Sequence, residues 1–98
     1  MKKIFKVGLI GCGNIAETYF RAHKYFNNFK IVKCADINSK VSDNCAKKYK
    51  IQSKSVAGIL KDKEIEVILN LTIPKAHYII AKKALFLKKM IKHHVEKI

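Results

Sequence analysis

The sequence predicts an α/β fold, a partial doubly wound parallel sheet of about four strands with helices on both faces. Short apolar runs typical of buried strands alternate with segments of helical periodicity. The first of these runs leads directly into a glycine-rich turn and then into a helix. At 98 residues the chain is long enough for one domain only, which we place over residues 1–98.

Four runs share the composition expected of strands, and they are residues 4–10, 30–35, 51–56 and 67–72. The segments with helical character are residues 14–26, residues 41–49, a single turn at 57–61 and a helix from Lys75 through Lys92. Ser39 or Ser42 is expected to cap the second helix. Right-handed crossovers give the strand order 3-2-1-4. Strand 67–72 would then be a sheet edge, open to self-association or to coverage by the last helix.

The glycine-rich turn is Gly11-x-Gly13-x-x-Ala16, between the first strand and the first helix. Gly11 permits a tight turn, Gly13 lets the backbone approach a pyrophosphate, and Ala16 lets the helix pack closely on the strand. The N–H groups at the helix start would face the phosphates. Asp36 ends the second strand, where a carboxylate accepts hydrogen bonds from the adenosine ribose. This order predicts a dinucleotide-binding Rossmann domain rather than a plain strand-to-helix turn.

The formal net charge of +14 invites a nucleic-acid interpretation, but the kind of basic residue argues against it. Arg21 is the only arginine among the 21 basic residues, and the lysines are spread along the whole chain. Base readout and bidentate phosphate contacts favour arginine, so we expect no specific nucleic-acid partner. No apolar run approaches the ~20 residues of a membrane span, and no signal-peptide core is present. We therefore expect a cytoplasmic protein without a membrane partner.

The chain has three cysteines, Cys12, Cys34 and Cys45, with no C-x-x-C spacing. An odd number at these spacings favours buried thiols in a reducing compartment over a disulfide framework or a zinc site. His93 and His94 are adjacent and have no cysteine or carboxylate at metal-ligand spacing. The sequence therefore predicts no metal site.

Three segments together resemble the amino-terminal domain of the glucose-fructose oxidoreductase, inositol dehydrogenase and rhizopine catabolism (Gfo/Idh/MocA) family. They are Gly8 to Ala16, Ala35-Asp36 and Thr72-Ile73-Pro74-x-x-His77, with matching order and spacing over about residues 3–87. The resemblance implies an NAD(P)-dependent oxidoreductase that transfers a hydride between the cofactor and a sugar, cyclitol or related hydroxyl compound.

The resemblance also implies which residues meet the cofactor. The pyrophosphate would meet the backbone of Gly11, Gly13, Asn14 and Ile15, and the adenosine ribose would meet Asp36. The floor beneath the cofactor would be Thr72, Ile73 and Pro74, with His77 near the cofactor at the start of the next helix. No cation directly follows Asp36, since Ile37 and Asn38 come next and Lys40 is the nearest lysine. A 2′-phosphate would face that carboxylate, so NAD is favoured over NADP.

The carboxyl end departs from the family pattern. Family members have a fifth strand that finishes in Glu-Lys-Pro, and its lysine is catalytic or orients the substrate. Here Glu96-Lys97 comes later than the pattern places it, and Ile98 stands in place of the proline. Lys97 is the candidate catalytic residue, and a solvated lysine at a helix end is the alternative.

The substrate domain of the family has no counterpart in these residues, so the chain is expected to be a truncated member. It would bind NAD with little or no turnover, and a sugar-like substrate would bind only if a second domain is supplied. The alternative function is a non-catalytic module that senses NAD(H) or another adenine nucleotide.

Overall fold

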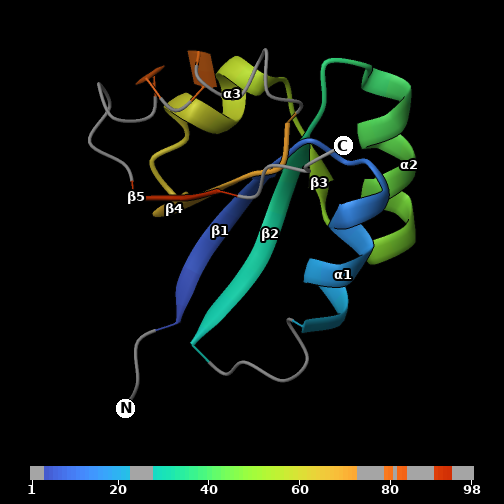
Figure 1. Ribbon diagram of the computed structural model, residues 1–98, viewed down its shortest axis with the longest axis horizontal. Helices are drawn as coiled ribbons and strands as arrows, with labels where there is room; N and C mark the ends of the chain where they lie inside the picture. Colours follow the sequence, from blue (N-terminus) through green and yellow to red (C-terminus); the bar gives the residue numbers. More distant parts are fainter. Residues whose placement is uncertain (1–3, 23–27, 73–78, 81, 84–89, 94–98) are drawn as a thin grey trace.

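The computed structural model describes residues 4–22, 28–72, 79–80, 82–83 and 90–93 (Figure 1). Its elements in chain order are β1 (Phe5–Ile10), α1 (Asn14–Ala22), β2 (Phe29–Ala35), α2 (Ser39–Tyr49), β3 (Gln52–Ser53), α3 (Val56–Lys61), β4 (Val67–Asn70) and β5 (Met90–His93). Among the described residues, no helix has the length and apolar character needed to cross a bilayer.

The strands form one sheet in the order β3-β2-β1-β4-β5, and every pairing is parallel. The predicted α/β class and the predicted order of the first four strands are therefore confirmed. Figure 1 shows α1 and α2 next to each other on one side of the sheet and α3 on the other. Such a layout follows from parallel strands, because each crossover places its helix on a face of the sheet.

Each face of the sheet buries its own apolar cluster. On the side of α1 and α2, Leu9 and Ile31 are fully buried against Phe20 and Ala46. On the side of α3, Ile10 and Ile68 pack with Ile59 and other apolar side chains. All four residues of β4 are buried, as expected of a strand covered on both faces. The two clusters hold the carboxyl ends of β1, β2 and β4 in fixed positions.

The carboxyl-terminal part of the sequence prediction is wrong in one respect. Residues 90–93 are a strand that pairs with β4, from Val67 opposite Met90 to Asn70 opposite His93. The end of the predicted helix, at residues 90–92, and the predicted edge at strand 67–72 are overturned, because β4 is paired with β1 and with β5. Residues 79–80 and 82–83 are helical, as predicted. Self-association through that edge loses its basis. A short apolar run fits a helix or a buried strand equally well by periodicity, and here the pairing with β4 decides.

The helix starts also differ from expectation. Asn38, rather than Ser39 or Ser42, caps α2, and its side chain accepts a hydrogen bond from the Lys40 N–H at 3.1 Å. Ser42 is buried, and its hydroxyl accepts a hydrogen bond from Ser53 at 3.0 Å. The buried Ser42 hydroxyl thereby has a hydrogen-bond partner.

Candidate functional site

The turn between β1 and α1 is fixed by its first glycine. Gly11 has φ +100°, and its N–H donates to the Ala35 carbonyl at 2.9 Å. A Cβ at this position would lie 2.7 Å from the Leu71 backbone carbon and 2.9 Å from the Thr72 nitrogen. Only glycine tolerates both the dihedral angle and the crowding. The turn is therefore held between the ends of β2 and β4.

The second glycine has the opposite surroundings. Gly13 is exposed, and a Cβ built on it meets nothing within 4 Å. Ala16, three residues later, is 2% exposed and packs in the core with Phe20. The turn thus presents open backbone to the outside at Gly13 and a small side chain to the sheet at Ala16. The sequence interpretation assigned these two positions to close ligand approach and close helix packing.

Asp36 follows β2 and joins the two neighbouring loops. One carboxylate oxygen accepts a hydrogen bond from the Cys12 N–H at 2.8 Å, and the other accepts one from the Asn38 N–H at 2.9 Å. A carboxylate oxygen has two lone pairs, so each oxygen can accept a second donor. The side chain is half-buried and directly followed by Ile37, which is 76% exposed.

The end of β4 carries a polar pair, Asn70 and Thr72, of which the sequence pattern pointed only to Thr72. Asn70 is fully buried, and its amide oxygen accepts hydrogen bonds from the Thr72 hydroxyl at 2.7 Å and from the Thr72 N–H at 3.3 Å. The Leu71 N–H donates to the Ile10 carbonyl at 2.8 Å. Asn70 thus fixes Thr72 beside the glycine turn. A single amide within an apolar strand was the signal available in the sequence.

The structure therefore brings four of the predicted residues to one edge of the sheet, namely Gly11, Gly13, Asp36 and Thr72. Asn14 begins α1, and Ile15 is half-buried against the core. The remaining predicted residues lie outside the described part of the chain, and they are Ile73, Pro74, His77 and Lys97. Open parallel sheets bind ligands at the carboxyl edge, where the strand order reverses. In this sheet the reversal lies between β1 and β4.

The three cysteines lie beside this edge. Their sulfur atoms are all within 4.8 Å of one another, although Cys12 lies in the glycine turn, Cys34 in β2 and Cys45 in α2. Cys34 and Cys45 are buried, as predicted, whereas Cys12 is half-exposed, and all three are free thiols. Their separation in the sequence gave no sign of this proximity, because it arises only when β1, β2 and α2 pack together.

A family model described as an oxidoreductase family with an NAD-binding Rossmann fold matches residues 5–97. Among solved structures, the chain is similar to myo-inositol dehydrogenase from Lactobacillus casei in complex with NAD(H) and myo-inositol. The TM-score is 0.82 and the identity is 22%, and the match covers 92% of this chain and 28% of that chain.

Two further structures are similar to this chain. GenD2 from gentamicin A biosynthesis, in complex with NAD, has TM-score 0.85 and 14% identity, covering 95% of this chain and 27% of that one. Biliverdin reductase from Synechocystis, in complex with biliverdin and NADP+, has TM-score 0.81 and 22% identity, covering 90% of this chain and 28% of that one. The chain therefore spans little more than a quarter of their length. A comparison with curated protein sequences found no match.

Proposed function

Because the chain belongs to the Gfo/Idh/MocA oxidoreductase family through its NAD-binding Rossmann domain, we propose that residues 1–98 are the cofactor-binding domain of a dehydrogenase. The cofactor lies across the carboxyl ends of β1, β2 and β4, and NAD is preferred to NADP. The enzyme transfers a hydride between the nicotinamide and a hydroxyl carbon of a sugar, cyclitol or related molecule. The proposal rests on two features at the same edge of the sheet: the backbone is open at Gly13, and a hydrogen bond from the Cys12 N–H fixes the Asp36 carboxylate.

The glycine turn suits a pyrophosphate. The Ala16 N–H already donates to the Gly13 carbonyl at 3.0 Å, but the N–H groups before it begin the helix, and the helix dipole makes this end partly positive. The space beyond the Gly13 Cα is empty of protein atoms to 4 Å. Phosphate oxygens would enter that space and accept from backbone donors at Gly13, Asn14 and Ile15.

The Asp36 carboxylate suits a ribose diol. Its two backbone hydrogen bonds, from Cys12 and Asn38, fix the position of the oxygens but leave acceptor capacity for hydroxyl donors. A 2′-phosphate at the same place would bring a second negative charge against the carboxylate. The exposed Ile37 beside it supplies no compensating cation. These observations support the preference for NAD.

The remaining assignments rest on the family resemblance. Thr72, held by Asn70 beside the glycine turn, is placed under the central part of the cofactor. Ile73 and Pro74 continue that floor in our proposal, His77 lies near the cofactor, and Lys97 is the candidate for orienting the substrate.

Bound NAD supplies the hydride acceptor. Hydride transfer additionally needs a substrate carbon held next to the nicotinamide and a group that exchanges the hydroxyl proton. The residues above bind and orient the cofactor, so we propose that the chain alone binds NAD(H) with little or no turnover.

Titration calorimetry of NADH and NADPH into the purified chain tests the proposal. We expect NADH to bind more tightly, and Asp36→Ala to weaken it by about 1–3 kcal/mol, the cost of losing a charged hydrogen-bond partner. Asp43→Ala is the matched control, because Asp43 is an exposed carboxylate on α2. A folded wild-type chain that binds neither dinucleotide would overturn the assignment.

Asp36 also holds two backbone N–H groups, so Asp36→Ala needs a check on folding. Thermal melts of each variant provide it, and Asp36→Asn keeps an acceptor while removing the charge. We expect Asp36→Asn to narrow the difference between NADH and NADPH, because the repulsion of the 2′-phosphate is gone. A difference that stays unchanged would show that Asp36 does not set cofactor choice.

A further inference from the structure

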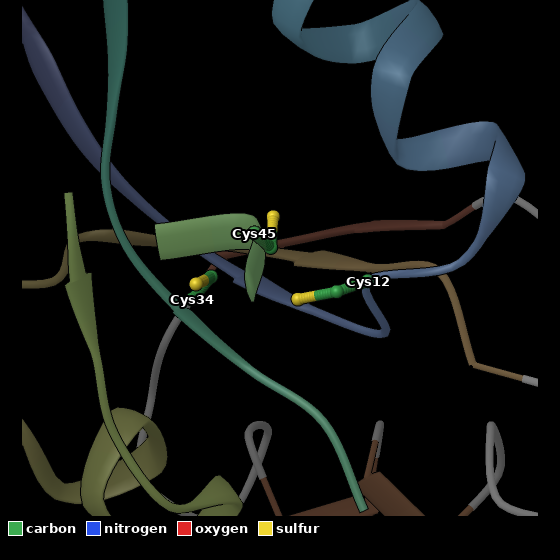
Figure 2. Close-up of side chains that lie close together, drawn as sticks. All are labelled: Cys12, Cys34 and Cys45. Atoms are coloured by element: carbon green, nitrogen blue, oxygen red, sulfur yellow. The ribbon is translucent and has the colours of Figure 1, made fainter. Parts of the chain in front are cut away.

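Figure 2 shows the three cysteine side chains lying close together. Cys12 comes from the turn, Cys34 from β2 and Cys45 from α2. Every pair of sulfur atoms is separated by 4.8 Å or less. Cys34 is fully buried and Cys45 is 8% exposed, so the packing of the sheet and α2 holds both in place.

The spacing of the sulfurs matches what a small metal ion requires. With Zn–S bonds of about 2.3 Å in a tetrahedral site, neighbouring sulfurs are about 3.8 Å apart. The three sulfur atoms lie at most 4.8 Å apart, so movements of about 1 Å or less bring each pair to the separation that zinc requires. Each cysteine has one freely rotating side-chain torsion with which to make that adjustment. Thiolates are also the ligands that soft metal ions prefer.

The sulfur cluster is reached from a cavity, and the charges around it suit a metal ion bound to three thiolates. A cavity of about 450 Å³ between α1 and α2 is lined by Cys12 and Cys45, and Lys48 forms part of its wall. Three thiolates around one divalent ion carry a net negative charge, which Lys48 and a chain of net charge +14 offset.

We propose that Cys12, Cys34 and Cys45 form a three-thiolate site for Zn²⁺, with the fourth coordination position facing the cavity between α1 and α2. Binding displaces the protons still held by the thiols, and a water from the cavity completes the tetrahedron. The three ligands are side chains of the protein, so zinc binding does not require bound NAD, although Gly13 lines the same cavity.

The alternative is that the thiols are plain core groups. The Cys12 thiol donates to the Ala35 carbonyl at 3.4 Å, and the Cys34 thiol to the Ser42 carbonyl at 3.5 Å. Metal binding would give up both weak hydrogen bonds in exchange for two metal–sulfur bonds.

X-ray absorption of the zinc-loaded wild-type chain, kept reduced with a phosphine, decides between the two. We expect one zinc per chain with three sulfur neighbours at about 2.3 Å. This measurement needs no variant, so it stands even if a cysteine substitution prevents folding. A first shell made mainly of nitrogen and oxygen, or zinc that washes out with no stoichiometric binding, would overturn the proposal.

A titration with Cd²⁺, followed by thiolate-to-metal charge-transfer absorption, gives an independent test. We expect saturation at one equivalent, and at least tenfold weaker binding in Cys45→Ser. Asp43→Asn, on the same helix and exposed, is the matched control and should bind as the wild type does. Equal absorption in Cys45→Ser and wild type would rule the site out.

Discussion

Two alanine substitutions in one turn, Gly11→Ala and Gly13→Ala, should have opposite consequences. The glycines are two residues apart, yet only Gly11 has a positive φ among the described glycines. An added Cβ at Gly11 meets three backbone atoms at 2.7–2.9 Å, where ordinary contact is 3.4–4 Å. An added Cβ at Gly13 meets nothing within 4 Å. The first change therefore acts on the fold, and the second on the ligand.

The magnitude for Gly11→Ala has two parts. Forcing a residue with a Cβ into left-handed backbone costs roughly 1–2 kcal/mol. Crowding against backbone atoms, which cannot rotate away as a side chain does, adds about 1–3 kcal/mol. The sum of about 2–5 kcal/mol is a large fraction of the ~5–15 kcal/mol expected for a domain of this size. It corresponds to a fall in Tm of at least ~8 °C.

Gly13→Ala should leave the free energy of unfolding within ~0.5 kcal/mol of the wild type, as an unobstructed surface change does. Its methyl group occupies the space that we assign to the pyrophosphate. We expect NADH affinity to fall at least tenfold, which is about 1.4 kcal/mol.

Urea unfolding of the three proteins, followed by circular dichroism, gives the stabilities, and calorimetry gives the NADH affinities. A Gly11→Ala chain as stable as the wild type would show that the turn relaxes easily. A Gly13→Ala chain that binds NADH unchanged would refute the placement of the phosphates.

Three further changes test the packing around the site. The Lys33 ammonium lowers the pKa of Asp62 below its usual range. The ionised Asp62 therefore stabilises the fold above the unfolded-state pKa of about 3.9, and this contribution is lost as the pH falls below that value. Asp62→Asn should therefore flatten the acid side of a Tm-against-pH curve, and an unchanged curve would contradict this. Asn70→Ala should lower the free energy of unfolding, measured with urea, by about 1–3 kcal/mol, because it removes the acceptor of the buried Thr72 hydroxyl. The rings of Phe20 and Tyr49 are stacked 3.8 Å apart, so a double-mutant cycle with leucine should give a coupling of about 0.5–1.5 kcal/mol, and a coupling near zero would mean that the stacking contributes nothing.

The part of the fold that sequence predicts well is local. The glycine turn, the Asp36 position and the order of the first four strands follow from short patterns, because a parallel sheet leaves few alternatives once its crossovers are right-handed. The strand at residues 90–93 could not be found this way, because a short run there fits the end of a helix or a strand equally well, and only its pairing with β4 decides. Local periodicity reports only on the segment itself.

The same limit applies to side chains. Ser42 has the composition of a helix cap, yet it is buried and bonded to Ser53, while Asn38 takes the cap. Both residues satisfy the helix-start pattern, and only the packing of α2 on the sheet decides between them. The proximity of Cys34 to Cys45 is equally a product of that packing.

Asp36 accepts the N–H of a residue 24 positions earlier, and the Leu71 N–H reaches back to the Ile10 carbonyl. The cofactor edge is therefore joined across its three strands by long-range contacts, each of which requires the closure of a long loop. An unfolded chain has no partial site, so NADH should bind the native state alone. A dinucleotide at 100 times its Kd would then add about 2.7 kcal/mol to the stability of the whole domain. In a cell, the supply of cofactor would help determine how much of the chain stays folded.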